Sequence, residues 1–172
     1  MIQITEATSQ DYILIQQIAH QTWPDTFSDI LSPAQIAYML VMMYSMSALT
    51  EQMEEKGYTF LLAKEEDKYL GFAAYELNYQ GLAKTKLHKI YILPKAQGKG
   101  LGKLLITHVA EIAVQNQTEV VSLNVNRNNP AINFYEKLGF KKVMEENIPI
   151  GEGFYMEDFV MDKKLTTAKL AN

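Results

Sequence analysis

The alternation of apolar and polar side chains changes its period along the first part of the chain. Residues 2–7 alternate one by one, which predicts a short strand. Apolar residues then recur at three- and four-residue spacing as far as about Trp23, which predicts a helix capped by Thr8 or Ser9. Several helix breakers follow, so we expect residues 23–33 to form a connection.

Two more helices are predicted before the first long strand. Ser32 followed by Pro33 is typical of a helix start, because serine caps the helix and proline fits its first position. This helix is predicted to reach about Tyr44. Ser47 is expected to cap a third helix, which Gly57 ends.

Three apolar segments separated by short polar turns come next. They cover residues 58–64, 69–77 and 85–93, and each is predicted to be a strand. Because the turns between them are short, we expect the three strands to be antiparallel.

The second half of the chain alternates helices and strands. The strand–helix–strand unit over 85–125 is expected to be parallel with a right-handed crossover. Together the elements predict an α/β fold with a mixed sheet, as one domain over 1–165 followed by a flexible tail over 166–172. The remaining predicted elements are a helix over 101–115, a strand over 119–125, a helix from about Asn129 to Gly139, and two antiparallel strands over 141–146 and 154–164.

The composition argues against several classes of protein. Sixteen Lys and Arg residues against 20 Asp and Glu leave a net charge of −4, which argues against a nucleic-acid binder. The chain has no cysteine, so no disulfide or thiolate site is available. We see no basic-then-apolar leader and no apolar stretch of membrane length, so we expect a cytoplasmic protein without a membrane partner. His20 and His108 lack partners at metal-ligand spacing, and no metal site is expected.

The segment KAQGKGLGKLL, residues 95–105, places three glycines between a predicted strand and a predicted helix. The first N–H groups of a helix lack partners and its dipole favours an anion, so this is a phosphate-binding pattern, with Lys99 and Lys103 adding positive charge. A Walker P-loop does not match, because Gln97 and Leu104 stand where it needs glycine and Ser or Thr. A dinucleotide G-x-G-x-x-G matches only weakly, which leaves the pattern Q-x-x-G-x-G.

Two stretches together resemble the GCN5-related N-acetyltransferase (GNAT) superfamily. LHKIYILPKAQGKGLGKLL resembles its acetyl-CoA pyrophosphate motif, and LNVNRNNPAINFYEKLGFKKV resembles its next strand and helix. The matching residues lie within 87–143, while the order of elements is similar over nearly the whole chain. TWPDTF and EDFVMDKKL are further similar to bacterial spermidine/spermine acetyltransferases. The resemblance implies an acyl-CoA N-acyltransferase fold and direct transfer of acetyl from acetyl-CoA to a primary amine.

The resemblance also implies roles around coenzyme A. Main-chain groups of Ile90, Tyr91 and Ile92 would hold the pantetheine arm and polarise the acetyl carbonyl. Asn128 would contact the coenzyme arm, and Tyr135 would protonate the departing thiolate; from the residues alone, a turn asparagine and a core tyrosine are the alternatives. The diphosphate would be bound by the main chain of Gln97, Gly98, Lys99, Gly100, Leu101, Gly102 and Lys103.

Several residues are candidates for the general base that takes a proton from the acceptor. Many family members have a glutamate at the position of His88, and histidine titrates near neutrality. Asp158, Glu76 and Glu157 are carboxylates that could act instead, through water. The plainer interpretation is a strand residue for His88 and surface charges for Glu76 and Glu157.

The acceptor site is expected to involve the N-terminal helices and the last strand pair. Four aromatic side chains are candidates for its wall, where an ammonium would make cation–π contacts, with core packing as the alternative for each: Trp23, Phe27, Tyr38 and Tyr79. The expected acceptor is a small-molecule amine, with a polyamine favoured. A peptide or protein amino group, a non-catalytic acyl-CoA sensor and a nucleotide-phosphate enzyme stay open as alternatives. Family members are often dimers, so a homodimer is a further expectation.

Overall fold

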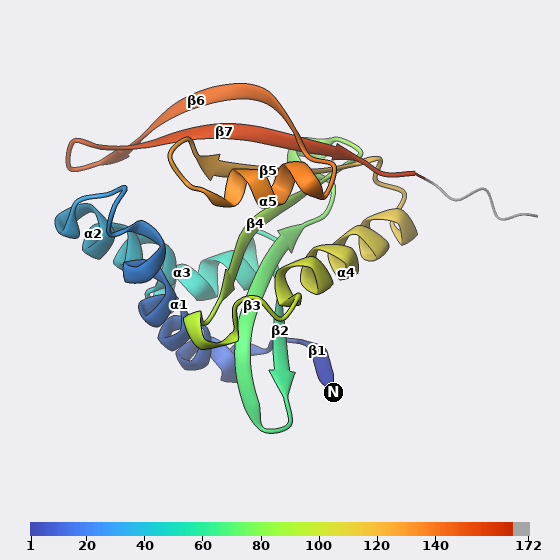
Figure 1. Cartoon of the computed structure of the whole chain (residues 1–172), viewed down its shortest axis with the longest axis horizontal. Helices are drawn as coiled ribbons and strands as arrows, with labels where there is room; N and C mark the ends of the chain where they lie inside the picture. Colours follow the sequence, from blue (N-terminus) through green and yellow to red (C-terminus); the bar gives the residue numbers. More distant parts are fainter. Residues whose placement is uncertain (167–172) are drawn as a thin grey trace, which may run out of the picture. The chain divides into compact units, whose positions relative to one another are not determined.

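The computed structural model describes residues 1–166, and within them seven strands form a mixed sheet in the order β1-β2-β3-β4-β5-β7-β6 (Figure 1). This architecture confirms the predicted α/β class. The strands are β1 (Ile2–Glu6), β2 (Thr59–Glu65), β3 (Lys68–Glu76), β4 (Lys84–Ile92), β5 (Val120–Asn126), β6 (Lys141–Gly151) and β7 (Phe154–Lys164). The α-helices are α1 (Tyr12–Phe27), α2 (Pro33–Tyr44), α3 (Met46–Thr50), α4 (Leu101–Gln115) and α5 (Ala131–Lys137).

The chain divides into two compact units. The first unit comprises residues 1–75 and 89–106, and the second comprises residues 76–88 and 107–166. Strand β4 therefore supplies residues to both units. From residue 167 on, the tail predicted over 166–172 lies outside the described residues.

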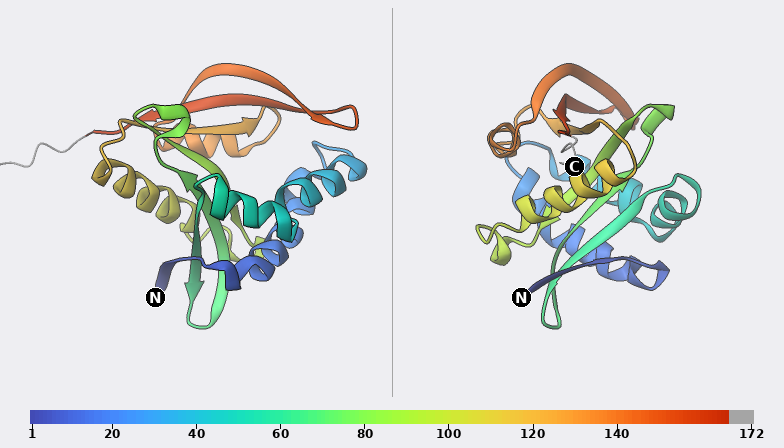
Figure 2. Two further views of the ribbon diagram at one scale, coloured as in Figure 1. Left: turned by 180° about the vertical axis from the view of Figure 1, so that it is seen from behind. Right: turned by 90° about the vertical axis from the view of Figure 1, so that its right-hand side faces the viewer.

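The first unit is built on antiparallel strands covered by helices α1 and α2. Strand β1 pairs with β2 and β2 pairs with β3, both antiparallel, as predicted for the hairpin of β2 and β3. Ring contacts pack Trp23 of α1 and Tyr44 of α2 against Phe72 of β3 and Tyr91 of β4. Figure 2 shows these helices and strands from two further directions. This aromatic core fixes the end of β4 on which the candidate site begins.

The second unit contains the crossover and the C-terminal hairpin. Strand β4 pairs in parallel with β5 from Lys84 opposite Val120 to Leu87 opposite Leu123, which confirms the predicted parallel pairing. Strands β6 and β7 form the predicted antiparallel pair, and β7 lies between β5 and β6. Buried apolar residues form the core of this unit: Leu87, Val109, Val121, Leu123, Ile132, Phe140 and Met161.

Among the helix boundaries that differ from the sequence-based expectation, two have a clear local cause. Helix α1 does not end near Trp23 but continues through Pro24 to Phe27, where the N–H of Ser28 donates to the carbonyl of Pro24 at 3.0 Å. Proline removes one helical hydrogen bond, and burial of the Phe27 ring offsets that loss. The expected cap at Ser47 is also wrong. The side chain of Ser45 caps α3, accepting from the N–H of Ala48 at 3.2 Å.

Candidate functional site

A glycine loop connects β4 to α4 in the first unit. After β4 a single 3₁₀ turn over Pro94–Ala96 leads into residues 97–100, all of which are exposed. Nε2 of Gln97 donates to the carbonyl of Ile92 at 3.4 Å and so ties the loop back to the end of the strand. We call residues 97–103 the glycine loop.

The three glycines of this loop have different reasons for being glycine. Gly98 and Gly100 have φ of +80° and +77°, a conformation that L side chains rarely adopt, and a Cβ at either would meet nothing within 4 Å. Gly102 is the second residue of α4, where the backbone is helical and alanine would favour the helix by at most about 1 kcal/mol. Gly102 therefore points to a need for bare main chain rather than for a special dihedral angle.

The start of α4 has the features of an anion site. The N–H of Leu104 donates to the carbonyl of Gly100 at 3.0 Å, which is the first helical hydrogen bond. The N–H groups of the preceding residues have no acceptor within the helix, and the helix dipole adds positive potential there. Lys99 and Lys103 are exposed on either side. A strand end, an exposed loop with little side-chain bulk and a helix N-terminus fit the diphosphate of coenzyme A.

The strand end that precedes the loop is packed from one side by aromatic rings. Ile90, Tyr91 and Ile92 are half-buried, and the Tyr91 ring lies 5.7 Å from Trp23 and 6.4 Å from Phe27 between centroids. Trp23 is 1% exposed and Phe27 is buried, which favours core packing for these two predicted wall residues. Tyr38 is half-buried on α2.

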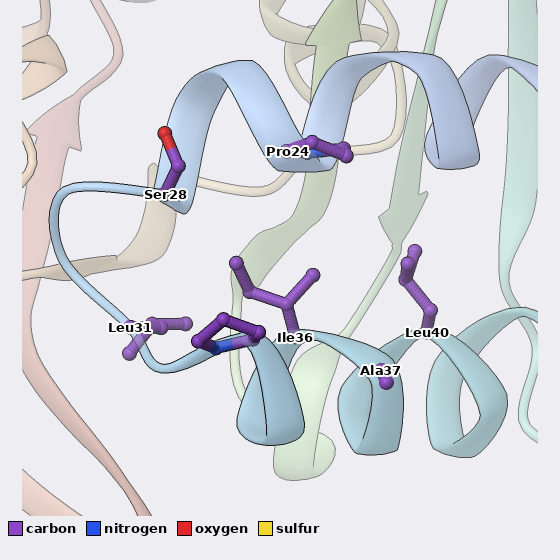
Figure 3. Close-up of a pocket in the computed structure, with 7 residues that line it drawn as sticks. Pro24, Ser28, Leu31, Ile36, Ala37 and Leu40 are labelled. Atoms are coloured by element: carbon purple, nitrogen blue, oxygen red, sulfur yellow. The ribbon is translucent and has the colours of Figure 1, made fainter.

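An apolar hollow of about 310 Å³ opens elsewhere in the first unit, where α1 ends and α2 begins (Figure 3). Its lining comes from neighbours of the predicted aromatic residues rather than from those residues themselves. The lining residues are Pro24, Ser28, Leu31, Pro33, Ile36, Ala37 and Leu40.

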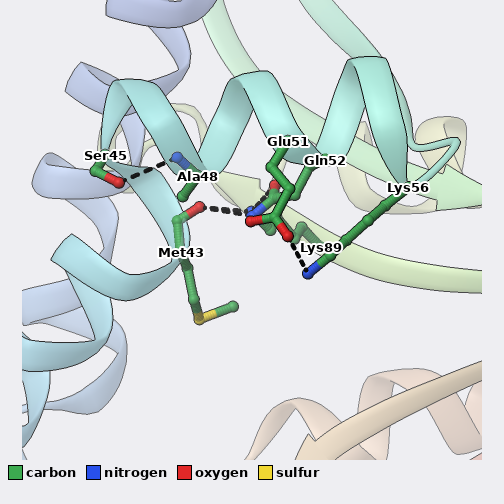
Figure 4. A network of polar contacts seen from close by, with 7 residues as sticks. All are labelled: Met43, Ser45, Ala48, Glu51, Gln52, Lys56 and Lys89. Carbon is green, nitrogen blue, oxygen red and sulfur yellow. Dashed lines mark hydrogen bonds and ion pairs between the residues drawn. The ribbon is translucent and has the colours of Figure 1, made fainter.

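A buried lysine, which the sequence analysis did not single out, lies on β4 beside the predicted base. The ammonium of Lys89 donates to Oε1 of Gln52 at 2.6 Å and to the carbonyl of Met43 at 3.0 Å (Figure 4). It also lies 4.2 Å from the centroid of the Tyr44 ring. Burial lowers the pKa of Lys89 to about 7, and the nearby charge of Lys56 adds to that effect. The lysine thereby joins β4 to the end of α2 and to the turn after α3.

In the second unit, His88 and Glu76 form a pair. Nε2 of His88 is 3.0 Å from Oε2 of Glu76, and the Tyr79 ring meets the imidazole edge-on at 5.7 Å between centroids. Burial raises the pKa of Glu76. Glu76 is thus a half-buried carboxylate paired with His88 rather than a fully solvated charge, whereas Glu157 is exposed, as a surface charge would be.

A second polar cluster in this unit surrounds Asp158. Asn124 accepts a hydrogen bond from the ammonium of Lys86 and donates to Glu146 at 2.9 Å and to Asp158 at 3.3 Å. Burial raises the pKa of Asp158, and the Asn124 hydrogen bond opposes that rise. Burial lowers the pKa of Lys86, whose ammonium also lies 5.3 Å from the centroid of the Tyr79 ring. The Tyr79 ring thus contacts His88 of the first polar pair and Lys86 of the cluster around Asp158.

Tyr135 and Asn128 also lie in the second unit. Burial raises the pKa of Tyr135 to about 12, and its ring packs on Phe134 and Phe140. Two other asparagines perform the turn functions near Asn128: Oδ1 of Asn126 accepts from the N–H of Asn128, and Oδ1 of Asn129 accepts from the N–H of Ala131, each at 2.9 Å. The exposed Asn128 side chain is not needed to build the turn.

Within each unit, the structure brings some predicted residues together. The first unit joins Ile90–Ile92 to the glycine loop, and the second joins His88 to Tyr79 and Glu76. The sequence analysis missed Lys86, Asn124, Glu146 and Lys89. For the lysines a signal existed, since both interrupt a buried strand. The hydrogen-bond partner of Lys86, Asn124, lies 38 residues away, which no local pattern reveals.

Among residues 1–166, no group of three or more His, Asp or Glu side chains is arranged to hold a metal ion. None of the helices in the described part is long and apolar enough to cross a membrane.

Comparison with protein families gives a match over most of the chain. The family described as "Acetyltransferase (GNAT) family" matches residues 15–140.

Individual proteins with similar sequences are N-acetyltransferases. The chain is 26% identical over 168 residues to the spermidine N(1)-acetyltransferase of Thermoplasma acidophilum, a match that covers 95% of this chain and 97% of that protein. It is 25% identical over 156 residues to the uncharacterized N-acetyltransferase YuaI of Bacillus subtilis, a match that covers 87% of this chain and 86% of that protein.

Solved structures show the same fold. The PaiA N-acetyltransferase of Thermoplasma acidophilum, in complex with coenzyme A, has a TM-score of 0.79 at 24% identity, and the match covers 95% of this chain and 99% of that one.

Proposed function

Because this chain belongs to the Acetyltransferase (GNAT) family, we propose that it transfers the acetyl group of acetyl-CoA to the primary amine of a small molecule. The observation that carries the proposal is the glycine loop, which is exposed over residues 97–100 and leads from the 3₁₀ turn after β4 into the N-terminus of α4. The similar PaiA structure is a complex with coenzyme A, which supports the same coenzyme here.

The proposed coenzyme site uses main chain more than side chains. The N–H groups of residues 97–103 would bind the diphosphate, and the main chain of Ile90–Ile92 would hold the pantetheine arm. Asn128 would add a side-chain contact to that arm. When bound, the coenzyme supplies an acetyl group activated as a thioester.

Two side chains are proposed to move protons. An ammonium has a pKa of about 10.4, so the acceptor must lose a proton before it can attack. His88 is the proposed base, with Asp158 as the alternative. Tyr135 is the proposed acid, because a phenol whose pKa is about 12 stays protonated at neutral pH and can donate to a thiolate.

A polyamine is the proposed acceptor class. The similarity to a spermidine N(1)-acetyltransferase over almost the full length of both proteins supports it. The carboxylates Glu76, Glu146 and Asp158, with the Tyr79 ring, offer the chemistry that ammonium groups bind. A peptide amino group is the second candidate acceptor. A homodimer and a cytoplasmic location stay predictions.

Release of free coenzyme A thiol tests the activity directly. Purified protein and acetyl-CoA are combined with spermidine, a monoamine, an amino acid or a short peptide, and thiol formation is followed. We expect turnover that is fastest with spermidine. Faster turnover of the peptide would overturn the polyamine assignment.

Thermal shift with acetyl-CoA separates the enzyme from a sensor. A rise in Tm without turnover of any amine would favour the non-catalytic sensor. No rise at saturating coenzyme would contradict the proposal as a whole.

A further inference from the structure

The imidazole of His88 is held from two sides in the second unit. Oε2 of Glu76, the last residue of β3, lies 3.0 Å from Nε2, and the ring of Tyr79 meets the imidazole edge-on. The side chains of His88 and Glu76 are only 16% and 23% exposed. The hydrogen bond and the ring contact together restrict rotation of the imidazole.

The contact with Glu76 also selects the tautomer of the neutral His88 imidazole. A carboxylate only accepts hydrogen bonds, so the nitrogen that faces it, Nε2, must carry a proton. The lone pair of the neutral imidazole is then on Nδ1. We propose that Glu76 is a positioning residue for His88, which it holds in the Nε2–H tautomer with Nδ1 as the proton acceptor. This proposal rests on the proposed function, in which His88 is the base.

The proton balance of the step is simple. Nδ1 would accept one proton from the acceptor's ammonium, and the nitrogen lone pair so released would form the new C–N bond as the C–S bond of the thioester breaks. The second proton that the nitrogen loses on becoming an amide balances the proton that Tyr135 gives to the departing thiolate. The imidazolium that results lies against the Glu76 carboxylate, which stabilises its charge. Release of that proton to water restores the neutral ring.

A neighbouring positive charge opposes the effect of Glu76 on the basicity of His88. In the second unit, Lys86 approaches the same Tyr79 ring from β4, with its ammonium 5.3 Å from the ring centroid. That positive charge disfavours an imidazolium, whereas Glu76 favours it. Removal of the Glu76 charge should therefore make His88 less basic.

The first test observes the imidazole directly by NMR and needs no turnover. The chain has three histidines, so the signals of His88 are assigned from their loss in His88→Gln. We expect an Nε2 proton that exchanges slowly with water in the wild type and in Glu76→Gln, which keeps an acceptor oxygen, and that exchanges rapidly in Glu76→Ala. A proton on Nδ1 in the neutral ring, or equal exchange in all three proteins, would overturn the proposal.

The second test uses the pH dependence of kcat/KM with the best amine. In Glu76→Gln the acid limb should move about one pH unit lower and kcat/KM should fall about tenfold, because the hydrogen bond remains but the charge is lost. His88→Gln should lose that limb. The control is Glu111→Gln, an exposed carboxylate on α4, which should leave the profile unchanged.

In the main alternative, Glu76 is the base and His88 is the positioning residue. If Glu76 were itself the base, Glu76→Gln would remove the acid limb and His88→Gln would keep it, which would refute the proposal. Absence of turnover in the wild type would instead reject the proposed function, while the NMR result would still decide whether Glu76 positions His88.

Discussion

Tyr135 is a buried phenol, and the role proposed for it needs a proton at neutral pH. Its pKa of about 12 means that the hydroxyl stays protonated throughout the physiological range. Tyr135→Phe keeps the ring that packs on Phe134 and Phe140, so the fold should be retained. We expect kcat to fall about a hundredfold, with coenzyme affinity changed by less than threefold, because only the proton donor is removed.

Steady-state kinetics of thiol release measure this effect, and titration calorimetry gives the coenzyme affinity. Phe134→Leu, at the exposed neighbouring ring, is the control for altered packing. A kcat of Tyr135→Phe equal to that of the wild type would remove Tyr135 from the mechanism.

Lys89 makes the stability of the protein depend on pH. Its pKa is about 7 in the folded state and about 10.4 when unfolded, so between these values the unfolded chain binds more protons. The free energy of unfolding should therefore rise with pH above 7, by at most about 1.4 kcal/mol per pH unit from this group. Below pH 7 the lysine is charged in both states and adds no slope.

Urea unfolding between pH 7 and 9 checks this prediction. Lys89→Met should remove most of the rise, whereas Lys68→Met, which alters an exposed lysine at the start of β3, should retain it. The restricted range avoids the tyrosines, which titrate near pH 10 when unfolded. Parallel curves for the wild type and Lys89→Met would show that Lys89 does not titrate there.

The sequence predicted the glycine loop but not the contacts between residues that lie far apart in the chain. The glycine loop was found because its residues are neighbours in the chain. Glu76 and His88 meet across the turn at Tyr79, and Lys86 meets Asn124 across the β4–β5 pairing. Such contacts depend on strand register, which the alternation pattern alone does not provide.

At the scale of elements, α4 carries the most specific prediction. Gly102→Ala should stabilise the free protein by up to about 1 kcal/mol, since alanine favours the helix. The same methyl group should lower coenzyme affinity at least tenfold, because it projects where the diphosphate approaches the main chain. Stability and affinity would thus change in opposite directions.

Chemical denaturation and calorimetry measure the two quantities. Thr107→Ala, at an exposed position of the same helix, should gain stability without loss of affinity. Unchanged coenzyme binding in Gly102→Ala would show that the main chain at this glycine is not approached closely.

Element types were readable from the sequence more reliably than element ends. The helix predicted over 101–115 has the same bounds as α4, and the Ser32–Pro33 start of α2 is confirmed. The end of α1 was not predicted, because local propensity stops a helix before Pro24 while tertiary packing of Phe27 extends it. Strand β6 reaches Gly151, five residues beyond the predicted end, because it pairs with β7 along its length.

At the scale of the whole molecule, the order of the elements, the glycine loop and the family match all indicate an acetyltransferase of the GNAT family. The match over residues 15–140 includes the glycine loop and Tyr135, which lie in different units of the structure. The family match therefore links two groups of candidate residues that the structure describes in separate units. The side chains proposed to bind the acceptor, such as Tyr79 and Glu146, lie outside the segment that resembles the coenzyme motif.

The central claim is that the glycine loop binds the diphosphate of coenzyme A, and amide NMR of the uniformly labelled protein tests it most directly. Coenzyme A should shift the amide signals of residues 97–103 and slow their exchange with water. Pantetheine, which lacks the diphosphate, should leave those amides unchanged while shifting signals of Ile90–Ile92. Loop amides that stay unchanged with coenzyme A at saturation, or that respond equally to pantetheine, would contradict the account.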